Sequence, residues 1–203
     1  MNTLLNIRTS LFGANGQSSQ LAERFVADWL KQNPDGRVVT RDLAAQPIPH
    51  LTAERFQAFA SSPQDRTPEQ QAAVAYSDEL IEEIKHAQTI VLGVPMYNFS
   101  VPSTLRAYFD HIARAGETFR YTSAGPEGLL QGKRAYVFVT RGGLYAEEAD
   151  TQTPYLRQFL RFIGIEPQFV YAEGLGLGEE AREQSLSAAR NVIAQLGELA
   201  LAA

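Results

Sequence analysis

The stretch TIVLGVPMYNFSVPSTLRAYFDHIAR, from Thr89 to Arg114, indicates the fold of the chain. It begins with a continuous apolar run, Ile90 to Val94, which is typical of a strand buried on both faces of a sheet. Pro95 cannot donate to a ladder and is expected to stop this strand. A helix then begins at Pro102 and Ser103, with apolar residues at helical spacing: Leu105, Tyr108, Phe109 and Ile112. The aromatic loop between strand and helix suits a flat heterocycle, although it could also merely cap the core.

Strands and helices alternate along the rest of the chain, which favours a parallel sheet with helices on both faces. The further strands that we expect are Leu4 to Arg8, Arg37 to Asp42, Arg134 to Thr140 and Gln168 to Glu173. The further helices that we expect are Ser19 to Gln32, Thr52 to Ala60, Thr67 to His86, Pro154 to Ile163 and Glu179 to Leu201. The prediction is one α/β domain over residues 1–203, a doubly wound five-stranded parallel sheet of the flavodoxin type with strand order 2-1-3-4-5.

Several segments have no clear periodicity. Gly116 to Lys133 is interpreted as an excursion that contains a short hairpin around Phe119 and Tyr121. Exposed aromatic residues in such a segment would indicate a partner surface. Ala146 to Thr153 is expected to be a polar loop. The glycines from Gly174 to Gly178 are interpreted as a turn, because a lone glycine motif is a weak signal for a nucleotide.

The composition excludes several classes of protein. The chain has 203 residues, no cysteine and a formal net charge of −5. Without cysteine there is no disulfide, thiolate metal site or cysteine nucleophile, and His50, His86 and His111 lack further ligands at metal-binding spacing. Acidic and basic residues are mixed, so nucleic acid is not an expected partner. No apolar run approaches the roughly 20 residues of a membrane span. We therefore expect a soluble cytoplasmic protein without a metal.

Two further loops, after the first and fourth strands, carry residues suited to a ligand. Ser10 to Ser18 places hydroxyls, an amide and glycine before a helix N-terminus, which favours a phosphate, although a plain capped helix start is the alternative. Arg141-Gly142-Gly143 would let a backbone approach a ligand closely, or form only a tight turn. The P-loop spacing is missing, and no G-x-S-x-G elbow supports a hydrolase. In the predicted strand order, these loops and the loop after the third strand meet at one edge.

The motifs together resemble a known family. They are Pro95-Met96-Tyr97-Asn98-Phe99, Arg114-Ala115-Gly116-x-Thr118-Phe119, Gly132-Lys133, Arg141-Gly142-Gly143 and Phe162-Ile163-Gly164-Ile165. From the first strand to the glycine turn after the fifth, the chain resembles the FMN-dependent NADH:quinone oxidoreductases called azoreductases. The resemblance implies a flavodoxin-like fold, FMN as cofactor, and a homodimer with two sites at the subunit interface. It also implies NADH or NADPH as donor and quinones or azo compounds as acceptors, in a ping-pong two-electron mechanism that needs no catalytic side chain.

The resemblance also implies roles for individual residues. Those implied to hold the phosphate are Ser10, Gly16, Gln17 and Ser18. Those implied to lie along the flavin ring or its polar edge are Met96, Tyr97, Asn98, Phe99, Thr140, Arg141, Gly142 and Gly143. Those implied to line the substrate pocket, some of them from the other subunit, are Asn98, Phe99, Phe119, Tyr121, Tyr145 and Phe162.

The chain departs from the family pattern at two of these positions. Many relatives carry serine at the positions of Gly16 and Thr140, so at position 16 only a backbone N–H is left as a phosphate donor. Two alternatives to an enzyme stay open. One is a flavodoxin-type electron carrier or flavin-binding regulator without its own NAD(P)H turnover, and the other is a scaffold that binds no flavin. No residue that would distinguish NADH from NADPH can be identified.

Overall fold

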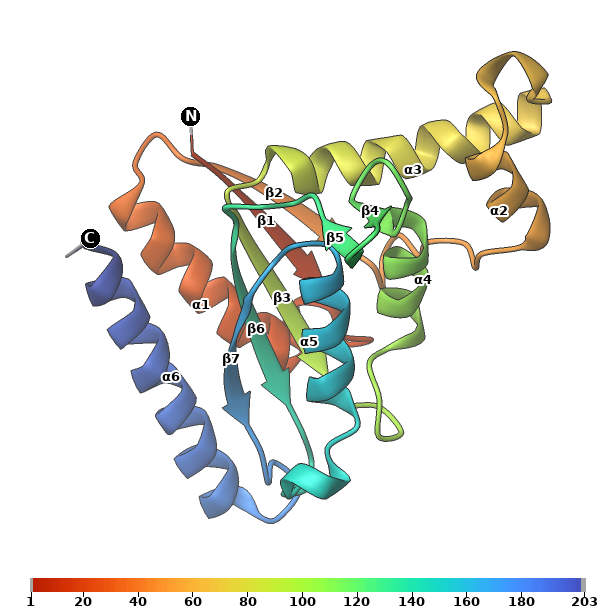
Figure 1. Ribbon diagram of the computed structural model, residues 1–203. Helices are drawn as coiled ribbons and strands as arrows, with labels where there is room; N and C mark the ends of the chain where they lie inside the picture. The colour runs from red at the N-terminus through yellow and green to blue at the C-terminus, as the bar shows by residue number, and fades with distance from the viewer. Residues whose placement is uncertain (1, 202–203) are drawn as a thin grey trace.

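A parallel sheet forms the centre of the protein, whose computed structural model describes residues 2–201. Its strands are β1 (Thr3–Arg8), β2 (Arg37–Asp42), β3 (Thr89–Pro95), β6 (Arg134–Thr140) and β7 (Pro167–Ala172). They lie in the order β2-β1-β3-β6-β7, and every neighbouring pair is parallel (Figure 1). This order agrees with the predicted 2-1-3-4-5 once the two strands of a separate hairpin are left out of the count. The carboxyl ends of the strands point to the bottom of Figure 1.

Helices cover both faces of the sheet. Those on one face are α1 (Gln17–Gln32) and α6 (Glu179–Leu201), and those on the other are α3 (Pro68–His86), α4 (Ser103–Ile112) and α5 (Gln152–Phe162). Side chains alternate along each strand, so the sheet supplies two cores. Leu5 and Ile7 of β1 join the core under α3, α4 and α5, whereas Leu4 joins the core under α1 and α6. Both expectations, the doubly wound sheet and the helices on both faces, are confirmed.

The strand that was predicted first is the centre of the sheet. All residues of β3 are buried, and it pairs with β1 on one side and with β6 on the other. The strand ends at Pro95, as expected, with Pro95 as the last residue of β3 opposite Thr140. The next backbone N–H, that of Met96, donates to the Thr140 carbonyl at 2.8 Å.

Several predicted boundaries move by a few residues. The first helix begins at Gln17 rather than Ser19, α5 begins at Gln152 rather than Pro154, and the last strand begins at Pro167 and ends at Ala172. The predicted polar loop before α5 therefore ends earlier than expected and also contains a short 3-10 turn, Glu147–Ala149. The crossover after β2 is irregular, as expected, and leads to the short helix α2 (Ala53–Ala60) and a 3-10 turn (Pro63–Asp65).

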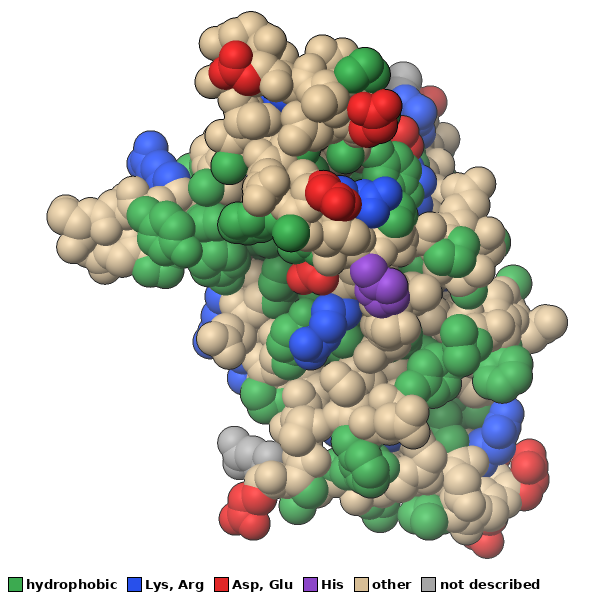
Figure 2. Space-filling view, turned by 90° about the vertical axis from the view of Figure 1, so that its right-hand side faces the viewer, with side chains coloured by type: hydrophobic (Ala, Val, Ile, Leu, Met, Phe, Trp, Pro, Cys, Tyr) green, Lys and Arg blue, Asp and Glu red, His purple; other side chains and the backbone are tan. Residues whose placement is uncertain are grey.

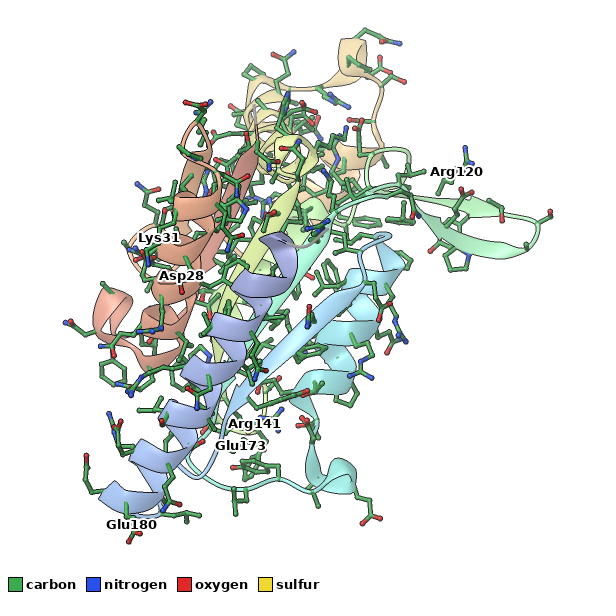
Figure 3. The ribbon with its side chains drawn as sticks, turned by 90° about the vertical axis from the view of Figure 1, so that its left-hand side faces the viewer. Asp28, Lys31, Arg120, Arg141, Glu173 and Glu180 are labelled. Atoms are coloured by element: carbon green, nitrogen blue, oxygen red, sulfur yellow. The ribbon has the colours of Figure 1, made fainter. Side chains whose placement is uncertain are left out.

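The excursion before β6 contains the predicted hairpin. It consists of β4 (Phe119–Thr122) and β5 (Gly125–Gly128), which pair antiparallel. The hairpin projects away from the body, and Arg120 on it lies at the far right of Figure 3. Its base is fixed against the turn after α5, because a Cβ on Gly128 would lie 2.0 Å from the backbone nitrogen of Gly164.

Candidate functional site

The loops after β1 and β3 are tied together at the carboxyl edge of the sheet. Thr9, the first residue after β1, donates its hydroxyl to the Gly93 carbonyl of β3 at 2.7 Å, and this contact is buried. The phenol oxygen of Tyr97 accepts from the Leu11 N–H at 3.2 Å and lies 3.4 Å from the Ser10 hydroxyl. Tyr97 thus reaches from the loop after β3 to the loop after β1, as the predicted convergence requires.

The N-terminus of α1 offers free donors beside this contact. Gly16 is its N-cap and supplies no side-chain cap. Among the described residues, the N–H groups of Gln17, Ser18 and Ser19 have no acceptor, because the first bond at this end runs from Gln20 to the Gly16 carbonyl. The Ser18 hydroxyl is buried and has no partner. Unpaired N–H groups, a positive helix end and an unpartnered hydroxyl are what a phosphate requires.

Close contact between α1 and β3 places these donors at the sheet edge. A Cβ on Gly93 would lie 2.9 Å from the Ser18 carbonyl oxygen, so only glycine at this position lets the first turn of α1 lie so close to the strand.

The loop after β3 is a strained two-residue turn. Tyr97 and Ser100 exchange backbone hydrogen bonds of 3.0 and 3.1 Å, and the two residues between them have positive φ, 48° at Asn98 and 64° at Phe99. This geometry is that of a type I′ turn, which Asn tolerates and Phe does not favour. The turn leaves the N–H groups of Asn98 and Phe99 without acceptors among the described residues. The Phe99 ring is 65% exposed at the rim.

The loop after β6 also presents backbone donors. Gly142 and Gly143 use their carbonyls to accept from Gly176 and Gly174, but within the described residues their own N–H groups have no acceptor. By contrast, the Thr140 carbonyl accepts from the Met96 N–H, and the Arg141 N–H donates to the Ala172 carbonyl. The free donors of this loop therefore come from the two glycines.

Arg141 was expected at the flavin, but its side chain turns into the protein. The guanidinium is 1% exposed and binds Asp150 at 2.8 Å and Glu173 at 3.0 Å. Figure 3 shows Arg141 and Glu173 side by side near the lower end of β7. Thr153 accepts a further bond at 2.7 Å and Gln152 one at 3.2 Å. Arg141 thus joins the ends of β6 and β7 to the first turn of α5, and its backbone N–H and carbonyl are paired with Ala172 and Leu175.

The first turn of α5 supports both of the other loops. The Gln152 amide donates to the Pro95 carbonyl at 3.0 Å, and the Thr151 hydroxyl donates to the Phe99 carbonyl. Burial raises the pKa of Asp150, but hydrogen bonds from Thr153 and Arg141 outweigh it and leave the pKa below its usual value. Sequence reasoning missed Asp150, Thr151, Gln152 and Glu173. The available signal was Arg141 itself, because a buried guanidinium requires carboxylate partners.

The aromatic residues predicted for the substrate pocket fall into two groups. Phe99 and Tyr145 lie together at the site, with ring centroids 6.2 Å apart. Phe119, Tyr121 and Phe162 form a second cluster, in which the Phe119 ring lies 4.3 Å from Phe162 and 5.5 Å from Tyr121. This second cluster is at the base of the hairpin, near the amino edge of the sheet, so within one chain it does not line the three loops.

Three further observations on the described residues concern a cavity away from the three loops, metal-binding side chains and membrane-spanning helices. A cavity of about 350 Å³ lies between α1 and α6, near Asp28 in Figure 3, at the amino edge of the sheet. Its amides are already paired, as Gln32 donates to Gly197 and Asn2 to Asn33. Across residues 2–201, no three metal-binding side chains are grouped around a common point. No helix in that range has both the length and the hydrophobicity to cross a bilayer.

Comparison with known proteins points in one direction. A family model described as a flavodoxin-like fold matches residues 2–196. A protein of Cellvibrio japonicus (strain Ueda107) named FMN-dependent NADH:quinone oxidoreductase is 54% identical over 197 residues, which are 96% of this chain and 98% of that protein. A protein of the same name from Alcanivorax borkumensis is 50% identical and covers 94% of this chain and 97% of its own length.

Two solved structures are similar over nearly their whole length. The azoreductase from Bacillus anthracis str. Sterne superposes with a TM-score of 0.90 at 28% identity, covering 97% of this chain and 99% of that one. The FMN-dependent NADH-azoreductase from Bacillus anthracis str. Ames Ancestor, in complex with FMN, has a TM-score of 0.86 at 25% identity and covers 97% of this chain and all (100%) of that one.

Proposed function

This chain belongs to the family of the FMN-dependent NADH:quinone oxidoreductases and is an oxidoreductase, and we propose that it binds FMN across the loops after β1, β3 and β6. In this proposal it transfers two electrons from NADH or NADPH to quinones and azo compounds by a ping-pong mechanism. The single observation that carries the proposal is the set of unpaired backbone N–H groups at one sheet edge. They come from the first turn of α1, from Asn98 and Phe99, and from Gly142 and Gly143.

The residues present fit the parts of FMN. Ser10, Gln17 and Ser18 would hold the phosphate with side-chain and backbone donors, whereas the Gly16 N–H, which the resemblance also implied, already donates to the Gly13 carbonyl at 3.2 Å. Met96 and Tyr97, both half-buried, and the exposed Asn98 would lie along the ring. Gly142 and Gly143 would donate to the polar edge of the ring, beside Thr140. Donors held in place by the sheet cost no reorganisation when negative charge develops on that edge.

When bound, FMN would supply the hydride chemistry, accepting from the nicotinamide and giving to the quinone or azo compound. This chain would orient the two substrates, one after the other, over the same face. Phe99 and Tyr145 would form the near wall of that space. No side chain at the three loops needs to act as an obligatory acid or base, and water can supply the protons.

The proposal includes a homodimer. Tyr121 is 75% exposed on the hairpin, and apolar side chains gather along the arm that projects to the left in Figure 2. Exposed aromatic residues on a projecting arm favour a protein partner. The second copy is proposed as that partner, with Phe119, Tyr121 and Phe162 reaching its pocket. A cytoplasmic location also stays part of the proposal, to be checked by cell fractionation.

The test begins with the visible spectrum of the purified protein, which should show bound flavin, and a colourless protein that takes up no FMN would refute the proposal. Mixing with NADH in a stopped-flow instrument should bleach the flavin rapidly in one two-electron step. An electron carrier would instead need a separate reductase and would accumulate a one-electron form. Initial rates at several quinone and azo concentrations should give parallel double-reciprocal lines, as a ping-pong mechanism requires.

A further inference from the structure

The cavity of about 350 Å³ at the amino edge of the sheet has a wall of aromatic rings. Phe25 and Trp29 of α1 and Tyr136 of β6 line it, and the centroids of the Phe25 and Tyr136 rings lie 4.4 Å apart. The Trp29 ring packs so closely on Gly36 that a Cβ there would lie 2.6 Å from it. Phe25 also packs against Phe138 of the core. Aromatic rings fixed in this way offer a preformed flat surface to a ligand.

Most polar side chains around this cavity have partners within the protein. The Gln32 amide donates to the Gly197 carbonyl of α6 at 2.8 Å, and the Asn33 amide donates to a carbonyl one turn earlier in α1 at 2.9 Å. These bonds reduce the negative potential that the carbonyl groups at helix C-termini present. Asp28 pairs with Lys31 at 2.7 Å, and both lie on α1 (Figure 3). The carboxylate beside the cavity therefore has a cation of its own.

Arg134 is the charged residue at the cavity that has no such partner. It is the first residue of β6, two positions before Tyr136, so both side chains lie on the face of the sheet that α1 and α6 cover. Its backbone N–H donates to the Gln88 carbonyl at 3.0 Å, which fixes its position at the sheet edge. Among the side chains that the structure describes, no carboxylate forms an ion pair with its guanidinium. The cavity thus combines an aromatic wall with an unpaired, planar cation.

Gly197 keeps the cavity open on the side of α6. Glycine is among the least favoured residues in the interior of a helix, yet this one lies within α6 and lines the cavity. A Cβ at this position would lie 3.1 Å from the amide nitrogen of Gln32, so a larger side chain would enter the cavity or displace that amide. The volume that remains, about 350 Å³, lies within the range of small-molecule sites and exceeds the roughly 150 Å³ that holds a benzene molecule.

We propose that this cavity is a second ligand site, which binds an aromatic carboxylate with its ring on the aromatic wall and its carboxylate on Arg134. A guanidinium can bind a carboxylate through two parallel hydrogen bonds, whereas a neutral or cationic ligand would leave it unpaired. The site is independent of the proposed FMN site, because the two lie at opposite ends of α1. This helix has 16 residues, a length of about 24 Å, so one ligand does not block the other.

The aromatic wall contains its own reporter, because Trp29 is the single tryptophan of the chain. The full chain with its bound flavin is titrated with benzoate, and binding is followed by tryptophan fluorescence and by calorimetry. Benzoate should bind saturably and change the emission of Trp29, while the visible spectrum of the flavin stays the same. Benzyl alcohol, which has the ring without the charge, and acetate, which has the charge without the ring, should each bind at least about tenfold more weakly.

Arg37 provides the matched control. Like Arg134 it is an exposed arginine and the first residue of a strand at the same edge of the sheet, but it does not line the cavity. Arg134→Gln should weaken benzoate binding by about tenfold or more, the usual effect of losing hydrogen bonds to a charged group. Arg37→Gln should change the affinity by less than about twofold. Gly197→Leu should also weaken binding, because its side chain fills the cavity from the side of α6.

Three results would overturn the proposal. They are no saturable binding of benzoate by either method, an affinity that Arg134→Gln leaves unchanged, and a change in the flavin spectrum that follows the binding curve. The last result would place benzoate at the flavin instead of in the cavity. A chain that binds no FMN can be titrated in the same way, so a failure of the proposed function is distinct from a failure of this inference.

Discussion

Replacing Arg141 with methionine tests whether the buried ion cluster holds the site together. The substitution keeps much of the side-chain volume but removes the cation from Asp150 and Glu173, whose side chains are 13% and 28% exposed. Removing one partner of a buried pair usually costs about 3–5 kcal/mol, because a charge is left uncompensated. Asp150 keeps backbone bonds from Gln152 and Thr153, and Glu173 can regain water. We therefore expect the lower end, a loss of about 3 kcal/mol in the free energy of unfolding.

Urea unfolding of the flavin-free chain at pH 7 measures this loss. The control is Arg190→Met, which removes an exposed pair with Glu183 whose side chains are 40% and 61% exposed, and it should change stability by less than about 0.5 kcal/mol. Arg141→Lys should fall between the two, because one ammonium cannot reach all the partners of the guanidinium. A loss below about 1 kcal/mol for Arg141→Met would refute the reasoning, since the cluster would then be no more than a surface pair.

The same cluster sets a direction for the effect of acid. The pKa of Asp150 is depressed in the folded protein, so its contribution to stability is present above its unfolded pKa of about 3.9 and is lost as the pH falls through the folded value. In Arg141→Met the pKa of Asp150 should rise, because the guanidinium no longer favours the charged form. The stability of this variant should therefore start lower than that of the parent at neutral pH but fall less steeply as the pH drops.

Three shorter predictions concern separate parts of the chain. Burial lowers the pKa of His111, so as the pH falls the unfolded chain binds a proton at this position before the folded chain does. The free energy of unfolding should therefore decrease as the pH drops below about 6.5. In urea unfolding at pH 5 to 7, His111→Gln should reduce this pH dependence, whereas the control His86→Gln should keep it. Phe99→Asn should raise the unfolding free energy by roughly 0.5–1 kcal/mol, since Asn tolerates positive φ, and it should also raise the KM for quinones. A lower unfolding free energy would show that the Phe99 backbone is not strained. Tyr121→Glu should shift the sedimentation mass from dimer to monomer, and an unchanged dimer would exclude the hairpin from the interface.

The main sheet was predictable because its central strand has a distinctive sequence, a continuous run of apolar residues. A run such as Ile90 to Val94 is typical of a strand buried on both faces of a parallel sheet, and the loops after neighbouring parallel strands lie at one edge of the sheet. Helix starts were less predictable. Gln17 begins α1 behind a glycine that gives no capping signal. Gln152 begins α5 because its amide is held by Pro95 and Arg141, contacts between residues that are distant in the sequence.

The candidate site was predictable in its loops but not in the direction of its side chains. The sequence RGG after a strand predicts glycines near a ligand, yet it does not reveal that the Arg141 guanidinium faces inward, because its partner Glu173 lies 32 positions away. Similarly, Phe119 and Tyr121 were recognised as candidates for a partner surface. Their distance from the three loops within one chain follows from the position of the hairpin, which only the tertiary structure shows.

The helix α5 joins features that the sequence presents as separate. At its N-terminus, the Thr151 hydroxyl donates to the carbonyl of Phe99, whose φ is positive, and the Gln152 amide donates to the Pro95 carbonyl at the end of β3. At its last turn, Phe162 packs against Phe119 at the base of the hairpin. Two consecutive residues with positive φ persist only where their surroundings hold them, and here that hold comes from a helix whose other end is fixed to the hairpin. If the hairpin enters the pocket of a second copy, α5 fixes the distance between two parts of one chain. These are its own flavin-binding loops and the aromatic side chains of its hairpin, which would contact the partner.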